Sequence, residues 1–141
     1  KYTIYKGEKI VNLKIYDLVN INIKKNDKKF IIRGIAGIKY YNTLDECNNL
    51  KREIQNSLEK TFKFDSKDIT KFASNQDETG KSMVYGIQNY FKPYPSNEAI
   101  MVNCYHFTKE SKIKRNLKVS VASEEFAYYI INEAFKKWKK F

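Results

Sequence analysis

Alternating hydrophobic and polar positions dominate the first forty residues. Val11, Leu13 and Ile15 alternate with polar neighbours, and the pattern recurs around residues 18–23 and in the return segment "FIIRGIAGIKYY". A period of two with β-branched residues predicts strands. The polar turn "KKNDKK" between the last two segments predicts a β-hairpin, and residues 2–5 predict a short earlier strand. Gly34 and Gly37 inside the return strand predict a bulge or a close approach by another backbone.

The pattern then changes to a helical period. Leu44 and Cys47 begin an apolar stripe that continues at three- and four-residue steps, which predicts a helix to about residue 60. The sequence "TLDE" forms a capping box at its start. The Thr43 hydroxyl can accept a hydrogen bond from the Glu46 amide, and the Glu46 carboxylate can accept one from the Thr43 amide.

The second half predicts three further strands and a final helix. Residues 63–81 are mostly polar, and the spacing of Ile69 and Phe72 predicts one short helical turn within a loop. Strands are predicted over 82–91, 99–108 and 117–122, with prolines interrupting the chain between the first two. Ser123 can cap a long helix over 124–140 whose apolar stripe ends at Trp138.

These elements predict a single α+β domain over residues 1–141. Their order is two or three strands, a helix, three strands and a second helix. Short connections favour one antiparallel sheet of about five to six strands. We expect both long helices to pack on one face of that sheet.

Composition limits what the charge can mean. The net charge is +11, which is typical of chains that bind nucleic acid or anionic surfaces. However, 24 of the 27 basic residues are lysine, and Asn, Ile, Tyr and Phe are also abundant, so AT-rich codon usage explains much of the basicity. No apolar run is long enough to span a membrane. The chain begins without Met, as a processed exported protein would.

The two cysteines offer four interpretations. Cys104 shares a strand face with Ile100 and Val102, and Cys47 lies on the apolar helical stripe, so both should point into the layer between helix and sheet. A disulfide is favoured, and it would indicate an oxidising compartment. The alternatives are two reduced core thiols, a metal site with His106, or a nucleophile activated by His106. His106 is the only histidine, and we interpret it as a structural group.

Aromatic and basic side chains in the second half suggest a binding surface or an interface. If both helices cover the Cys104 face, the other sheet face needs a ligand, a partner protein or a second copy of the chain. The alternative is that the rings belong to the hydrophobic core or form cross-strand pairs. The candidate residues are Tyr85, Phe91, Tyr94, Met101, Tyr105, Phe107, Lys109, Lys112, Lys114 and Arg115.

We recognise no catalytic or cofactor motif. The carboxylates of "FDSKD" and "NQDET", which include Asp77, are interpreted as solvated turns. The sequence therefore predicts an exported periplasmic or secreted module that acts by binding or self-association, with no cofactor or metal. One alternative is a cytoplasmic nucleic-acid-binding domain that uses the lysine-rich turns and aromatics. A Cys-His enzyme is the third.

Overall fold

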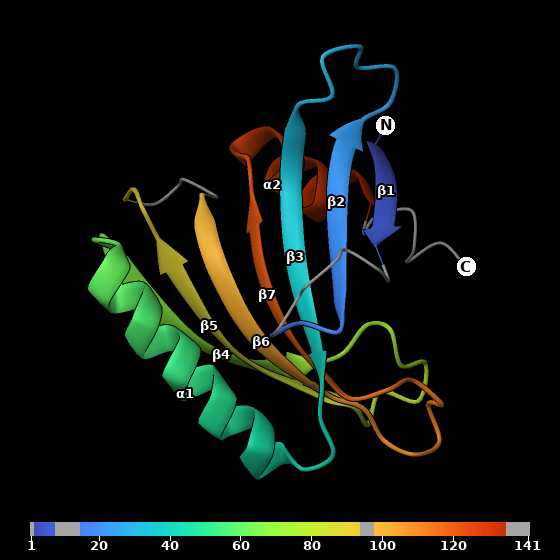
Figure 1. The fold of residues 1–141 in the computed structure, drawn as a ribbon. Coiled ribbons are helices and arrows are strands. Elements are labelled where there is room, and N and C mark those ends of the chain that lie inside the picture. Colours follow the sequence, from blue (N-terminus) through green and yellow to red (C-terminus); the bar gives the residue numbers. More distant parts are fainter. Residues whose placement is uncertain (1, 8–14, 94–97, 135–141) are drawn as a thin grey trace.

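A computed structural model describes residues 2–7, 15–93 and 98–134 of the chain. They form one antiparallel sheet of seven strands with two helices (Figure 1). The elements are β1 (Tyr2–Gly7), β2 (Leu18–Lys24), β3 (Ile32–Tyr40), α1 (Leu44–Thr61), β4 (Ser66–Ala73), β5 (Met83–Tyr90), β6 (Ala99–His106), β7 (Asn116–Ala122), α2 (Glu124–Tyr129) and a π-helical turn, Ile130–Ala134.

Two runs of consecutive strands make up the sheet, in the order β1-β2-β3-β7-β6-β5-β4. The first run is β1 to β3, and it contains the predicted hairpin, whose turn includes Asn26 at a positive φ of 66°. The second run is β4 to β7, and it folds back so that β7 lies beside β3. Helix α1 connects the two runs. Strands β1 and β4 are therefore the outer strands.

The predicted strand number was too low, because residues 66–73 form strand β4 and not a short helical turn. Ile69 is 83% exposed on one side of β4, and Phe72 is 44% exposed on the other. An outer strand that is exposed to solvent on both faces needs no alternation of apolar and polar residues. The three-residue spacing of its two apolar side chains then resembles a helical turn.

The prediction of two long helices on one face was also wrong. Helix α1 contacts β6 and β7, whereas α2 has six residues and contacts β3 from the opposite face (Figure 1). Gly34 explains this placement, because a Cβ there would lie 2.7 Å from Cδ1 of Phe126. The Tyr2 ring packs on Phe126, with centroids 4.7 Å apart. Residues 135–141, including Trp138, lie outside the described residues.

The core lies between α1 and the sheet, on what we call the α1 face. Its buried members are Tyr41, Cys47, Val102, Cys104 and Leu117. At the start of α1, the Thr43 hydroxyl accepts the Glu46 amide at 3.2 Å, as the capping box predicts. The Glu46 carboxylate reaches the Asn42 amide at 3.0 Å, one residue earlier than predicted.

Cys47 and Cys104 form a disulfide in this core, with their Sγ atoms 2.08 Å apart and their Cα atoms 6.1 Å apart. This is the pairing that the helical stripe and the strand face predict. Both residues are fully buried. The bond joins α1 to β6 and is compatible with a location outside the cytoplasm. Among the described residues, no helix is both long and apolar enough to cross a membrane.

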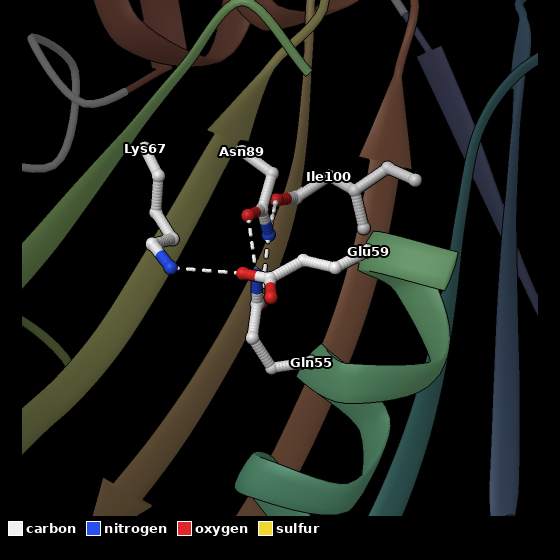
Figure 2. Close-up of polar contacts among 5 residues, drawn as sticks. All are labelled: Gln55, Glu59, Lys67, Asn89 and Ile100. Atoms are coloured by element: carbon white, nitrogen blue, oxygen red, sulfur yellow. Dashed lines mark hydrogen bonds and ion pairs between the residues drawn. The ribbon is translucent and has the colours of Figure 1, made fainter. Parts of the chain in front are cut away.

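A polar network joins the far end of α1 to β4 and β5 (Figure 2). Gln55 and Asn89 are both buried and bond to each other. Gln55 Nε2 also donates to Glu59 Oε1 at 2.8 Å, and the same oxygen accepts from Lys67 Nζ at 2.8 Å. Asn89 Nδ2 donates to the Ile100 carbonyl at 3.3 Å. The network thus fixes α1 over the outer half of the sheet.

Glycines in β3 mark ring contacts. A Cβ on Gly37 would lie 2.8 Å from the Tyr16 ring, on the face opposite to the Gly34 contact with Phe126. The predicted close approach is therefore made by side chains and not by another backbone. An irregularity in the β2–β3 pairing lies nearby, between Asn22 and Ile23 of β2.

Candidate binding groove

An open groove of about 550 Å³ lies where β3 ends and β7 begins. One wall comes from the connection between β3 and α1, and the other from the loop between β6 and β7. The volume is within the range of small-molecule sites. Of the residues that the structure describes, those that line it are Tyr40, Tyr41, Asn42, Phe107, Thr108, Lys109, Ile113, Lys114 and Arg115.

Arg115 holds the two walls together. Its Nε donates to the Phe107 carbonyl at 2.9 Å, and its Nη1 donates to the Asn42 carbonyl at 2.8 Å. The Arg115 carbonyl in turn accepts the Tyr41 amide at 3.3 Å. These hydrogen bonds fix the guanidinium in position, and Arg115 still forms part of the groove surface. A fixed planar cation binds an anion with less loss of side-chain entropy than a free lysine.

The other charges in the groove are also positive. Lys114 Nζ lies 5.3 Å from the centroid of the Tyr40 ring, a cation–π distance. Within the part of the chain that the structure describes, neither Lys109 nor Lys114 is ion-paired. Among the described residues, no carboxylate lines the groove and none pairs with these three cations. The three positive charges give this end of the sheet a positive potential.

Tyr41 and His106 lie behind the groove and support it. Tyr41 Oη donates to the Tyr105 carbonyl at 3.0 Å and lies 3.5 Å from His106 Nδ1. Burial raises the pKa of Tyr41 to about 12, against the opposing effect of Arg115. Burial, followed by the positive charge of Arg115, lowers the pKa of His106 below its ordinary value. Both side chains are therefore neutral at pH 7.

The disulfide limits the chemistry that His106 can support. Both sulfurs are bonded to each other, so in this oxidation state neither is a thiolate nucleophile or a metal ligand. The His106 ring instead stacks against Tyr41, with centroids 6.3 Å apart. Among the described residues, no three His, Cys, Asp or Glu side chains are grouped to hold a metal ion.

A buried carboxylate braces the loop beside the groove. Asp77 is 5% exposed, which corrects the prediction that it lies in a solvated turn. Its Oδ2 accepts the amide and the hydroxyl of Ser82, and Ser82 Oγ accepts the Thr108 amide at 2.9 Å. Hydrogen bonds, first from the Ser82 side chain and then from Thr79, lower the pKa of Asp77 to about 2. The β4–β5 loop thereby positions Thr108 in the groove wall.

The candidate surface residues divide among several places. Phe107, Lys109, Lys114 and Arg115 line the groove, and Lys112 lies in the same loop. Tyr85 packs against the core on the α1 face. Phe91 packs with Phe62 and Phe64, and Tyr94 lies outside the described residues. Met101 and Tyr105 lie on the face opposite to α1.

Sequence reasoning missed the other half of the groove. Tyr40, Tyr41 and Asn42 belong to the first half of the chain, and only the pairing of β3 with β7 brings them to Arg115. Three comparisons, against protein-family models, curated proteins and solved structures, found no match to this chain.

Proposed function

We propose that the chain is a binding module that acts outside the cytoplasm and takes an anionic ligand in the basic groove. The observation that supports this is the lining itself. Lys109, Lys114 and Arg115 converge on one groove without a carboxylate among its described lining residues. Lys109 and Lys114 are exposed and Arg115 is partly buried, and all three can donate charge-assisted hydrogen bonds to carboxylate and phosphate oxygens.

The disulfide supports the location. A disulfide between core elements forms and persists in oxidising environments such as the periplasm or the extracellular space. Burial also keeps Cys47 and Cys104 away from small thiols. A cytoplasmic location would leave both cysteines reduced, as two small apolar groups in the same core.

Nucleic-acid binding is the second candidate, and Tyr40 is the residue that favours it. Its ring is 40% exposed beside Lys114, so a base could stack on the ring while the ammonium contacts a phosphate. However, one aromatic ring and three cations can contact only a few nucleotides. We therefore rank a small anion, or an anionic group on a larger partner, above a single strand of nucleic acid.

Self-association through the second sheet face has less support. Phe107 is 1% exposed and Tyr105 stacks on it, with ring centroids 6.0 Å apart. Helix α2 also lies over β3 on that face (Figure 1). The rings expected to need a second copy are thus partly covered within the chain, and we do not assign this face as a dimer interface.

Calorimetric titration with citrate and with inorganic pyrophosphate tests the proposal. Lys109→Ala combined with Lys114→Ala should weaken binding by about two- to thirtyfold, the range for two exposed ion pairs. The matched control is Lys25→Ala with Lys28→Ala, which removes the same charge from the exposed β2–β3 turn. Equal weakening by both pairs would mean that net charge alone attracts the anion. Tight binding of an oligothymidine, without binding of either anion, would favour the second candidate.

A further inference from the structure

The outer strand β4 presents a long, regular edge. All eight residues of β4 pair with β5 without a bulge, and β5 is its only neighbour among the described strands. Natural proteins usually shorten, bend, cover or charge such edges, because the open backbone can pair with another chain, and the lysines of β4 oppose pairing with a basic strand. Here only Thr70 is even partly buried, and the other β4 side chains are exposed.

The direction of the free backbone groups follows from the ladder. The Ser74 amide donates to the Ser82 carbonyl at 2.8 Å, so position 74 faces β5. Hydrogen bonding alternates along an antiparallel strand, and the odd-numbered residues of β4 therefore direct their N–H and C=O groups outward. Three of them, Lys67, Ile69 and Lys71, form a row at the centre of the edge.

The same three residues share the α1 face at the edge of the sheet. Ile69 is 83% exposed, although α1 covers β6 on this face. Lys67 is ion-paired with Glu59 at 2.8 Å, and Lys71 Nζ lies 5.5 Å from the centroid of the Tyr85 ring. An apolar side chain between two cations is thus held at a backbone edge that can accept another strand.

In the three central registers, a second copy of the chain matches this edge less well than an acidic peptide does. A two-fold axis between two antiparallel edges must run perpendicular to the sheet, so residues on one face meet residues of that same face. A register centred on Ile69 places Lys67 opposite Lys71 twice. A register centred on Thr70 places Lys71 opposite Ile69 and Lys67 opposite Ala73, so neither lysine meets a carboxylate. A register centred on Asp68 apposes two like carboxylates. Like charges directly opposite each other are destabilising.

We propose that β4 docks an extended peptide of another protein, which pairs antiparallel with its edge. On the α1 face the peptide carries acidic residues opposite Lys67 and Lys71 and an apolar residue opposite Ile69. The recognised segment is therefore acidic–x–apolar–x–acidic. Main-chain hydrogen bonds supply affinity, and the alternating side chains supply specificity, as in other cases of strand addition.

The edge continues into a second cavity. About 420 Å³ of space opens where β4 begins, and its lining includes Ser66, Lys67, Phe62 and Phe64. An antiparallel peptide leaves the edge at this end with its carboxyl-terminal residues. The two phenylalanine rings favour an apolar side chain there, two or more residues after the second acidic position. This cavity lies apart from the basic groove, and the two share no lining residue.

Fluorescence anisotropy with a labelled Ser-Glu-Thr-Ile-Thr-Glu-Ser peptide tests the proposal. We expect it to bind about two- to thirtyfold more tightly than the same peptide with lysine in place of glutamate, because an attractive pair replaces a repulsive one at Lys71, whereas Glu59 already offsets the charge of Lys67. Lys67→Glu combined with Lys71→Glu should reverse that preference. Ile69→Pro should abolish binding, because it removes an outward N–H while the ladder to β5 keeps its own bonds. Equal binding of both peptides would overturn the proposal.

Two further results separate this surface from the others. The variant with Lys109→Ala and Lys114→Ala should bind the peptide as the wild type does. Loss of binding there would place the peptide in the basic groove and overturn the β4 proposal. Sedimentation of the peptide-free protein should show no association that Ile69→Pro removes. Such a dimer would assign the edge to a second copy instead. Failure of the groove to bind citrate would leave the peptide result unchanged.

Discussion

Gln55 of α1 and Asn89 of β5 exchange a pair of side-chain hydrogen bonds across the helix–sheet interface (Figure 2). Gln55 Nε2 donates to Asn89 Oδ1 at 2.7 Å, and Asn89 Nδ2 donates to Gln55 Oε1 at 2.9 Å. Asn89 is completely buried. Each amide satisfies the other in a place that water does not reach, so the two side chains act as one unit.

Replacing one member of this pair should cost more than replacing both. Gln55→Leu or Asn89→Leu leaves a buried amide without its partner, and each should lower the free energy of unfolding by about 1–3 kcal/mol. The double change removes both polar groups and should be less destabilising than the sum of the single changes. Urea unfolding of the four proteins gives the coupling free energy. Strict additivity would show that the two amides do not depend on each other.

The disulfide should contribute strongly to stability. It closes a loop with a sequence separation of 57 residues, which corresponds to about 4 kcal/mol in the chain-entropy account. Guanidinium unfolding of the oxidised protein and of the same protein held in reductant measures the difference without any substitution. Mass spectrometry should show that the native chain lacks both thiol hydrogens. Two free thiols in protein kept under oxidising conditions would contradict the bond and the proposed location.

Low pH should destabilise the β4–β5 loop, which is held in place by hydrogen bonds to the Asp77 carboxylate. Its pKa is lowered from 3.8 to about 2 in the folded chain, so the carboxylate contributes stability above pH 4 and loses it as the pH falls towards 2. Asp77→Asn should therefore be less stable than the wild type at pH 6, and the difference should shrink towards pH 2. Thermal unfolding at several pH values measures this. Asp68→Asn, at an exposed carboxylate of β4, is the control. A difference independent of pH would refute the assignment.

The packing of α2 on β3 depends on the absence of a side chain at Gly34. A methyl group there would lie 2.7 Å from Cδ1 of Phe126, so the ring must move. Gly34→Ala should lower the free energy of unfolding by about 1–3 kcal/mol, the usual cost of overpacking. Adding Phe126→Leu, which makes room for the methyl group, should recover part of the loss. A Gly34→Ala protein as stable as the wild type would show that α2 does not need this contact.

Local patterns predicted strands β1 to β3, strands β5 to β7 and the disulfide, because each depends on neighbours in the sequence or on one shared layer. The strand predicted at Val11 and Leu13 lies outside the described residues. The alternation around residues 18–23 identified β2, and the stripe through Cys47 identified the buried side of α1. The groove was harder to predict from the sequence. The loop that carries Lys114 and Arg115 was identified as basic, but Tyr40 joins it only through the pairing of β3 with β7. No local spacing encodes that pairing.

The errors have identifiable physical causes. Strand β4 has no buried face, so Ile69 and Phe72 gave no alternating signal. Gly34 carried the information that a ring packs on β3, but a glycine does not reveal which element approaches it. Asp77 resembled its solvated neighbours because its hydrogen bonds to Ser82 and Thr79 form only when the loop closes.

The most direct test of the proposed function is an amide chemical-shift titration of the labelled protein with citrate and pyrophosphate. The proposal predicts shifts at residues 40–42 and 107–115, with little change in the lysine-rich turn around residues 24–29. Those shifts should disappear in the variant with Lys109→Ala and Lys114→Ala and persist in the variant with Lys25→Ala and Lys28→Ala. Shifts spread over every lysine-rich turn, and equally reduced in both variants, would contradict a specific groove.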